Sequence, residues 1–177
     1  EVSNIKWFPY EEALEKISKP DVLVGQFEIP MNVNEQVFSY AYKNGVETVL
    51  NPAPANKPSD TLLQNTSWFI PNEIEFEEIY GGVFNENNLL LFAKNVDTNV
   101  VVTLGEKGCA YIKNNSVKII KADSVKAIDT TGAGDAFVGA FSFALASKLD
   151  IEECLKLALK KATDSVTKKG TQSSYMN

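Results

Sequence analysis

The sequence predicts an α/β fold in which helices flank a mainly parallel β-sheet. Two observations support this prediction: short β-rich runs alternate with helical stretches over residues 21–103, and an expected hairpin follows over residues 109–121. The chain has 177 residues, of which 44% are apolar and 23% are charged, as in an ordinary soluble domain. We therefore expect one packed domain and no general disorder.

Apolar periodicity places the elements of the first hundred residues. Strands are expected where short apolar runs lie between turn residues, at Asp21–Gly25, Val46–Leu50, Ser67–Ile70 and Asn99–Thr103. A helix over 32–44 places four apolar side chains on one face: Val33, Val37, Tyr40 and Ala41. Two further helices are expected, an acidic one opened by Pro71 and another over 86–95.

The pattern changes after residue 108. Cys109–Lys113 and Val117–Lys121, joined through Asn114-Asn115, predict an antiparallel hairpin. Two helices are expected next, over about 133–147 and 150–167. The second has one apolar stripe, formed by Ile151, Cys154, Leu155, Ala158, Leu159, Ala162 and Val166. It is therefore expected to cover one face of the sheet.

Composition excludes several classes of function. A net charge of -6 and a pI near 4.8 argue against a nucleic-acid-binding surface, which is normally basic. A local cradle could still bind a phosphorylated small molecule. The absence of histidine excludes Ser-His-Asp and Cys-His catalysis and most zinc sites. No apolar run approaches the ~20 residues that span a bilayer, so no membrane partner is expected.

The cysteines and the first residues bear on cellular context. Cys109 lies in an expected strand and Cys154 on an expected helix, with neither disulfide nor metal spacing. A reducing compartment, the cytoplasm, is therefore the expected location. The chain begins with Glu1 and not with Met, and we expect its true N-terminus to lie upstream.

Residues 129–135, which read Asp-Thr-Thr-Gly-Ala-Gly-Asp, are the most informative segment. Gly132 and Gly134 allow the backbone to turn tightly and to expose its amides where a helix begins. Such amides, together with the helix dipole, attract an anion. Asp135 would lie beside that anion, where a carboxylate can deprotonate a hydroxyl that attacks a phosphoryl group.

A purely structural reading of this segment is the alternative. Thr130 or Thr131 would then cap an ordinary helix, and Asp135 would complement its dipole. The apolar run 136–146 nevertheless predicts a buried helix with a buried start, where a lone carboxylate needs a reason. We therefore favour a functional role. Neither a P-loop nor G-x-G-x-x-G accounts for the segment, because no G-x-x-x-x-G-K-[ST] is present and the third glycine position is Phe137.

Four other segments combine a functional reading with a structural one. Two glycines in Thr103–Gly108 allow close approach to a ligand, or merely reverse the chain. The run 72–75, Asn-Glu-Ile-Glu, could hold a hydrated magnesium ion, or simply decorate a helix start with acid. Gln26-Phe27-Glu28 follows a strand, where α/β proteins place ligand groups, although an exposed loop is an equal rival. Lys168-Lys169-Gly170 is typical of helix termination.

Taken together, these segments resemble the ribokinase-like sugar kinases, the phosphofructokinase-B type family. The run Asp-Thr-Thr-Gly-Ala-Gly-Asp-Ala-Phe at 129–137 closely resembles the C-terminal signature of that family. Four further segments resemble the ribokinase branch more than fructokinases or adenosine kinases: 26–28, 51–54, 71–75 and 103–105. The resemblance implies a three-layer αβα sandwich, of which 1–177 would be the C-terminal ATP-binding portion, without the N-terminal part and the lid.

The resemblance also implies roles for individual residues. Asp135 would be the general base, and the amides of Gly132, Ala133 and Gly134 would form an anion hole for the γ-phosphoryl group. ATP contacts would come from Asn72, Thr103, Leu104, Gly105, Glu106, Lys107 and Gly108, as well as Gly134 and Asp135. Glu28 would contact the sugar, and Glu75 would help hold Mg²⁺ through water. A K⁺ site would be formed mostly by backbone carbonyls of Asp129, Thr131, Ser165, Lys168, Gly170 and Ser174.

Two positions depart from the family pattern. Leu159 stands where a histidine often lies near the adenine, and Ser173 replaces a proline beside the cation site. The expected activity is ATP-dependent phosphorylation of the 5-hydroxyl of D-ribose. The alternatives are a related kinase for fructose, adenosine or another sugar or nucleoside, and a non-catalytic nucleotide-binding fragment. The resemblance implies a sugar and ATP as partners and pairing of the full-length protein through its lid as a homodimer.

Overall fold

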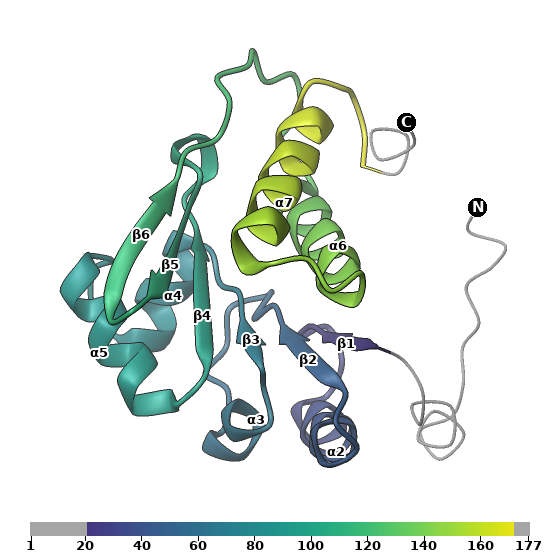
Figure 1. Ribbon diagram of the computed structural model, residues 1–177, viewed down its shortest axis with the longest axis vertical. Helices are drawn as coiled ribbons and strands as arrows, with labels where there is room; N and C mark the ends of the chain where they lie inside the picture. Colours follow the sequence, from purple (N-terminus) through teal and green to yellow (C-terminus); the bar gives the residue numbers. More distant parts are fainter. Residues whose placement is uncertain (1–20, 172–177) are drawn as a thin grey trace, which may run out of the picture.

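The computed structural model describes residues 21–171, which form a six-stranded sheet with helices on both faces (Figure 1). The strands follow chain order across the sheet: β1 (Val22–Gly25), β2 (Glu47–Leu50), β3 (Trp68–Phe69), β4 (Asn99–Thr103), β5 (Cys109–Lys113) and β6 (Ser116–Ile120). The first four strands are parallel, and β5 and β6 continue the sheet antiparallel. The predicted mainly parallel sheet and its hairpin are confirmed.

Within the described residues, six α-helices surround this sheet: α2 (Met31–Lys43), α3 (Asp60–Gln64), α4 (Glu73–Tyr80), α5 (Glu86–Val96), α6 (Ala133–Ala146) and α7 (Ile151–Val166). A 3₁₀ turn, η2 (Gly105–Lys107), follows β4. All of these helices except α3 were predicted. The five residues of α3 are too few for a helical period to register.

Alternation along the strands explains the three layers. In β4, Val100 and Val102 face one core and Val101 faces the other, because successive side chains of a strand point to opposite faces. The first core also contains buried residues of α2, α3, α4 and α5, and the second those of α6 and α7. Figure 1 shows α6 and α7 together on one side of the sheet. The three-layer prediction is confirmed.

The buried face of α2 differs from the predicted one. Phe38 and Ala41 are buried, whereas Val37 and Tyr40 are only partly buried beside Val46. Phe38 reaches the main core of that face, so the large aromatic ring sets the rotation of the helix and the smaller apolar residues lie at its margin. Asn34 is also buried, and its side chain donates a hydrogen bond to the carbonyl of Gln26.

Both cysteines are buried in the core between the sheet and the α6–α7 layer. Burial raises the pKa of the Cys109 thiol to about 12, which leaves almost no thiolate at neutral pH. These cysteines therefore act as small apolar side chains. Within residues 21–171, none of the helices combines the length and the apolar composition that crossing a bilayer requires.

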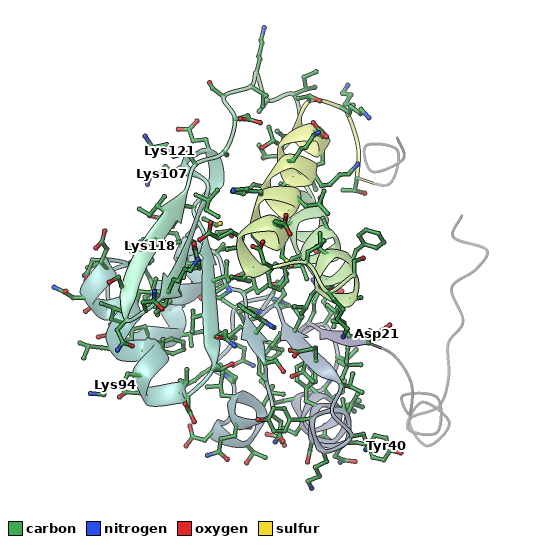
Figure 2. All side chains as sticks on the ribbon, in the orientation of Figure 1. Asp21, Tyr40, Lys94, Lys107, Lys118 and Lys121 are labelled. Atoms are coloured by element: carbon green, nitrogen blue, oxygen red, sulfur yellow. The ribbon has the colours of Figure 1, made fainter. Side chains whose placement is uncertain are left out.

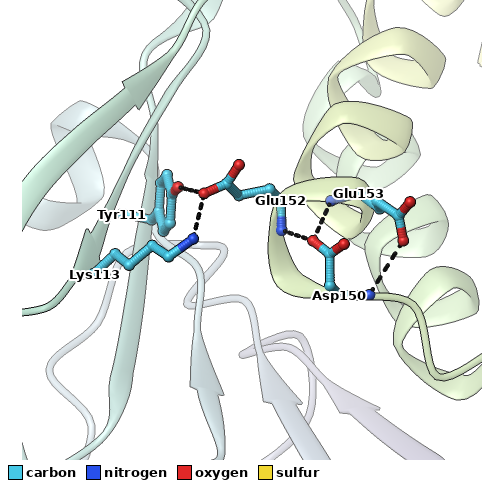
Figure 3. A network of polar contacts seen from close by, with 5 residues as sticks. All are labelled: Tyr111, Lys113, Asp150, Glu152 and Glu153. Carbon is cyan, nitrogen blue, oxygen red and sulfur yellow. Dashed lines mark hydrogen bonds and ion pairs between the residues drawn. The ribbon is translucent and has the colours of Figure 1, made fainter.

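A polar network fastens the start of α7 to the hairpin (Figure 3). Glu152 Oε1 accepts hydrogen bonds from the hydroxyl of Tyr111, at 3.1 Å, and from Lys113 Nζ, at 2.5 Å. Asp150 caps the helix by accepting the N–H groups of Glu152 and Glu153, and the Glu153 carboxylate accepts the N–H of Asp150 in return. The network therefore joins the hairpin to the helix that covers it.

We expect this network to make stability depend on acid pH. The Lys113 hydrogen bond, reinforced by that of Tyr111, lowers the pKa of Glu152 from its ordinary 4.5. A lowered carboxyl pKa stabilises the fold above pH 4.5, and this contribution is lost as pH falls through the folded-state value. Glu152→Gln should therefore destabilise the protein near neutral pH and match the wild type in strong acid.

Urea unfolding of both proteins between about pH 3 and pH 7 at low salt checks this prediction. Glu106→Gln, at an exposed glutamate outside the network, is the control. A gap between wild type and Glu152→Gln that stays constant across the range would contradict the expectation.

Candidate active site

A cavity of about 680 Å³ lies beyond the carboxyl end of β4. Such a volume suits a ligand of nucleotide size. Its walls come from the loop that follows β4, the segment 122–130, the start of α6 and one side of α7. The lining includes the apolar side chains of Phe137, Leu159 and Val166 and the polar residues Thr103, Lys107 and Thr130. The cavity thus combines an apolar wall with groups that can bind phosphate.

The start of α6 differs from most helix starts in the described chain. Ser59, Asn72, Asn85 and Asp150 each cap a helix with a side chain, whereas the N-cap residues of α2 and α6, Pro30 and Gly132, do not. The predicted alternative, capping by Thr130 or Thr131, is therefore wrong. Gly132 has φ 78 and ψ 5, a left-handed conformation that glycine adopts without strain.

The backbone at this terminus reaches the cavity. Ala133 and Gly134 line it, and so does Thr130. The Ala133 N–H donates to Thr130 O at 3.3 Å, longer than an ordinary N–H···O bond. A ligand oxygen with better geometry could take over this donor. The α6 start therefore has the character of an anion-binding terminus.

Asp135 directly follows Gly134, which lines the cavity, but is not itself a lining residue. It is exposed, so the prediction of a buried carboxylate is wrong. The reason is that α6 turns one side outward along its length: Gly139 is exposed, and Phe143, two turns beyond Asp135, is 68% exposed. The carboxylate is nevertheless held, because its Oδ1 accepts a hydrogen bond from Gln26 Nε2 at 3.1 Å.

Asp129 ties the segment before α6 to the end of α7. Its Oδ1 accepts the N–H of Thr131 at 3.0 Å, and its Oδ2 accepts the N–H of Gly170 at 3.1 Å. The carbonyl of Val166 also accepts the N–H groups of Ile128 and Asp129. The hydrogen bonds from Thr131, followed by that from Gly170, lower the pKa of Asp129, which stays ionised near neutrality. The predicted cation-site residues Asp129, Thr131 and Gly170 are thus brought together.

We expect Asp129→Asn to loosen this tie locally. The two N–H groups bind different carboxylate oxygens, and the carboxamide replaces one of these oxygens with an N–H₂ donor, so one N–H group loses its acceptor. Amide hydrogen exchange at Thr131 and Gly170 should become faster, while exchange in the strands stays unchanged. Asp164→Asn, at an exposed aspartate of α7, is the matched control. Unchanged exchange at both amides in Asp129→Asn would show that the carboxylate does not hold the loop.

The loop after β4 forms another wall of the cavity. Gly105, Glu106, Lys107 and Gly108 line it, whereas Leu104 is buried in the core. The loop closes on itself, because Leu104 N–H donates to Gly108 O at 2.8 Å. Lys107 pairs with Glu73 at 3.4 Å and reaches the same end of the hairpin as Lys121 (Figure 2). Lys107 thus brings a positive charge to the cavity wall, where Glu106 and Asp123 are also present.

Asn72 and Glu75 form a capping box at the start of α4. Asn72 Oδ1 accepts the N–H of Glu75, and Glu75 Oε2 accepts the N–H of Asn72, both at 2.8 Å. A backbone bridge places Asn72 beside Thr103, at the same sheet edge as the cavity. Burial raises the pKa of the Glu75 carboxyl. The hydrogen bond from the Asn72 N–H opposes this shift, and repulsion from the Glu78 carboxylate adds to it. The alternative expected for this segment, an acidic helix start, is therefore confirmed. The capping box uses the Asn72 side-chain oxygen and leaves its N–H₂ group as a donor.

Comparison with known proteins decides the family. A model of the pfkB family carbohydrate kinases matches residues 6–177. The chain belongs to this family.

The individual proteins that are similar to this pfkB family member are sugar kinases as well. Deoxyribokinase of Salmonella typhi is 36% identical over 171 residues, which are 93% of this chain and 56% of the relative. Ribokinase of Haemophilus influenzae is 41% identical over 165 residues, which are 90% of this chain and 54% of that relative. The chain thus spans about half the length of these relatives. A solved structure of Arabidopsis thaliana ribokinase complexed with ribose and ATP is also similar to this chain, with a TM-score of 0.86 and 28% sequence identity. The match covers 93% of this chain and 55% of the Arabidopsis chain.

The other residues predicted to belong to the site of this pfkB family member lie in different parts of the chain. Glu28 is exposed on the loop after β1, and Ser165 and Lys168 lie at the end of α7. Ser173 and Ser174 lie outside the described residues. Among residues 21–171, no group of three or more His, Cys, Asp or Glu side chains could hold a metal ion. A magnesium ion held by Glu75 through water, and a cation held by backbone carbonyls, need no such group.

Sequence reasoning missed two parts of this site. Gln26 was noted within its motif but given no role, and the lining segment 122–127 was not noted at all. This segment has neither periodicity nor a motif, so no local signal could have identified it. Only the path of the chain between β6 and α6 brings it over the cavity.

Proposed function

We propose that the chain is the ATP-binding, C-terminal portion of a ribokinase. The whole enzyme would transfer the γ-phosphoryl group of ATP to the 5-hydroxyl of D-ribose, giving ribose 5-phosphate and ADP. One observation carries the proposal: a cavity of nucleotide size is lined by Ala133 and Gly134 at the start of α6, and Asp135 directly follows them. Similarity to ribokinases supports the substrate.

The chemistry follows from this placement. Asp135 takes the proton of the 5-hydroxyl as that oxygen bonds to the γ-phosphorus. The bond between the γ-phosphorus and the β–γ bridging oxygen breaks, and ADP leaves with its electron pair. The amides of Gly132, Ala133 and Gly134 donate to the γ-phosphoryl oxygens and stabilise their charge. Most of the rate enhancement would come from positioning and electrostatics.

The remaining contacts to ATP would come from both walls. Thr103, Gly105, Glu106, Lys107 and Gly108 would hold the nucleotide from one side, and the Asn72 amide would donate to its phosphates. Leu104, which is buried, would support the loop through packing and contribute at most its backbone. Glu28 would contact the sugar from the loop after β1. Leu159 offers an apolar surface to the base.

Two metal ions belong to the proposal. Magnesium would neutralise charge between the phosphates, with Glu75 oriented towards its water shell by the capping box. A K⁺ ion would bind where Asp129 and Thr131 lie against the end of α7, with Ser165, Lys168, Gly170 and Ser174 as further oxygen donors. Asp129 would supply negative charge beside the carbonyls.

We expect K⁺ to stabilise the protein more than Na⁺ does. An ion that binds only the folded state raises the unfolding temperature by about 2–4 °C for each kcal/mol that it adds to the free energy of unfolding. Thermal unfolding in KCl and in NaCl of equal ionic strength measures the difference, without any need for activity. The difference should disappear in Asp129→Ala. Equal unfolding temperatures in the two salts would remove K⁺ from the proposal.

A substrate panel tests the acceptor. Ribose, 2-deoxyribose, fructose and adenosine should be compared by kcat/KM in the full-length protein, since a deoxyribokinase and ribokinases are similar to this chain. A clear preference for ribose is expected. A preference for 2-deoxyribose, fructose or adenosine would identify a related kinase with the same catalytic apparatus.

The rival from another class is a nucleotide-binding fragment without activity. Calorimetry and an ADP-release assay on the 177-residue chain separate the two functions. A fragment would bind ATP and show no ribose-dependent ADP release, whereas the full-length kinase shows both. Because the reaction consumes ATP and both cysteines are free thiols, we propose the cytoplasm as its location.

A further inference from the structure

We propose that Gln26 is a positioning residue for Asp135. Its side-chain amide donates to Asp135 Oδ1 at 3.1 Å, across 109 positions of sequence. The inference rests on the proposed role of Asp135 as the base. An exposed carboxylate such as that of Asp135 can rotate, and proton transfer needs one of its oxygens at a fixed place. A bond to Oδ1 fixes the group and leaves Oδ2 for the proton.

The backbone of Gln26 is itself firmly held. Its carbonyl accepts a hydrogen bond from Asn34 Nδ2 at 2.8 Å, and Asn34 is only 2% exposed. The neighbouring residues are fixed as well, because Asn51 N–H donates to Gly25 O at 3.0 Å and Phe27 N–H donates to Ala53 O at 2.9 Å. The burial of a polar side chain in α2 thus has a physical reason: Asn34 anchors the loop that carries Gln26.

Close packing leaves this loop little freedom to move. A Cβ added to Gly25 would lie 2.5 Å from Phe38 Cε2 and 2.9 Å from Asn34 Oδ1. The chain at 25–26 therefore fits against α2 without spare room. A series of contacts runs from the buried Asn34 through Gln26 to Asp135, which joins α2 to the start of α6.

The amide suits this task better than a cation would. A lysine or arginine would form an ion pair with the carboxylate and weaken it as a base. A neutral amide N–H orients the carboxylate with a smaller effect on its proton affinity. Glutamate has the same shape, but it cannot donate and would repel Asp135.

The test uses Gln26→Met in the full-length kinase, because methionine has similar length and no donor. We expect kcat to fall about 10-fold and KM for ATP and sugar to stay within about twofold. Gln26→Glu should lower kcat further, because it also adds a like charge. Gln64→Met, at an exposed glutamine that ends α3, is the matched control and should retain full activity.

A double-mutant cycle separates positioning from a general structural role. Once Asp135 is replaced by asparagine, Gln26→Met should cause no further loss of kcat, because the carboxylate it positions is gone. An equal 10-fold loss in both backgrounds would overturn the proposal, and so would an unchanged kcat in Gln26→Met alone. Unchanged thermal unfolding of each variant confirms that the fold is intact, and Gln26→Glu serves should Gln26→Met fail to fold.

The two proposals fail in different ways. Wild-type turnover in Asp135→Asn would remove the base itself and therefore the proposed function. A large loss in Asp135→Asn, with no loss in either Gln26 variant, would leave the function standing and remove only the positioning role.

Discussion

Replacing Asp135 by asparagine is expected to lower turnover by roughly 10²–10⁴ in the full-length protein, the usual contribution of a positioned base. ATP affinity should remain near the wild-type value. Asparagine keeps the shape of the side chain and an oxygen for the Gln26 hydrogen bond, but it cannot accept a proton at neutral pH. The loss should therefore fall on kcat, with little change in KM.

Steady-state kinetics with ribose and ATP measures the loss of turnover, and calorimetry measures ATP affinity. Asp123→Asn, at an exposed aspartate that lines the cavity, is a demanding control for charge alone. It should change ATP affinity at most, and not the chemical step. Full turnover in Asp135→Asn would exclude Asp135 as the base.

The second large effect is expected for Gly108→Ala. Gly108 has φ 105 and ψ -129, a region that essentially only glycine occupies. A Cβ there would overlap the carbonyl oxygen of Ile120 and lie 2.8 Å from Ala122 N. Both neighbours are backbone atoms, so the hairpin end would have to move. We expect a loss of about 3 kcal/mol or more, which lowers the unfolding temperature by roughly 6–12 °C.

ATP binding should weaken in the same variant, because Gly108 and Ala122 both line the cavity. Thermal unfolding and calorimetry check the two effects. Gly139→Ala introduces the same methyl group in mid-helix, where nothing lies within 4 Å of the added atom. It should be neutral or slightly stabilising, since alanine favours helices. Similar losses in both variants would mean that the overlap at Gly108 is not the cause.

Much of the fold could be predicted because each element has a local signal. The strand Asn99–Thr103 was predicted with its observed bounds, since a β-branched run lies between polar residues. The Asn114-Asn115 turn was equally clear, and both residues have positive φ in the structure. The rotation of α2 could not be predicted, because it depends on where Phe38 finds space in the core.

The site divides in the same way. The residue at which α6 begins was predicted, because glycines stand directly before an apolar helical run. The exposure of Asp135 was not, since the apolar composition of α6 gives no indication of which side faces outward. Likewise, the contact between Gln26 and Asp135 depends on the relative placement of β1 and α6, which no local pattern encodes.

The division of the core by the sheet has a consequence for how damage would spread. The loop after β4 is supported through Leu104 by the α2–α5 layer, whereas the α6 terminus belongs to the opposite layer. The two walls of the proposed nucleotide site are thus supported by different layers, which are connected by the strands and by the Gln26–Asp135 hydrogen bond. A core mutation in one layer would displace the wall that it supports and leave the other wall in place. Affinity for ATP and the rate of phosphoryl transfer would then be lost independently.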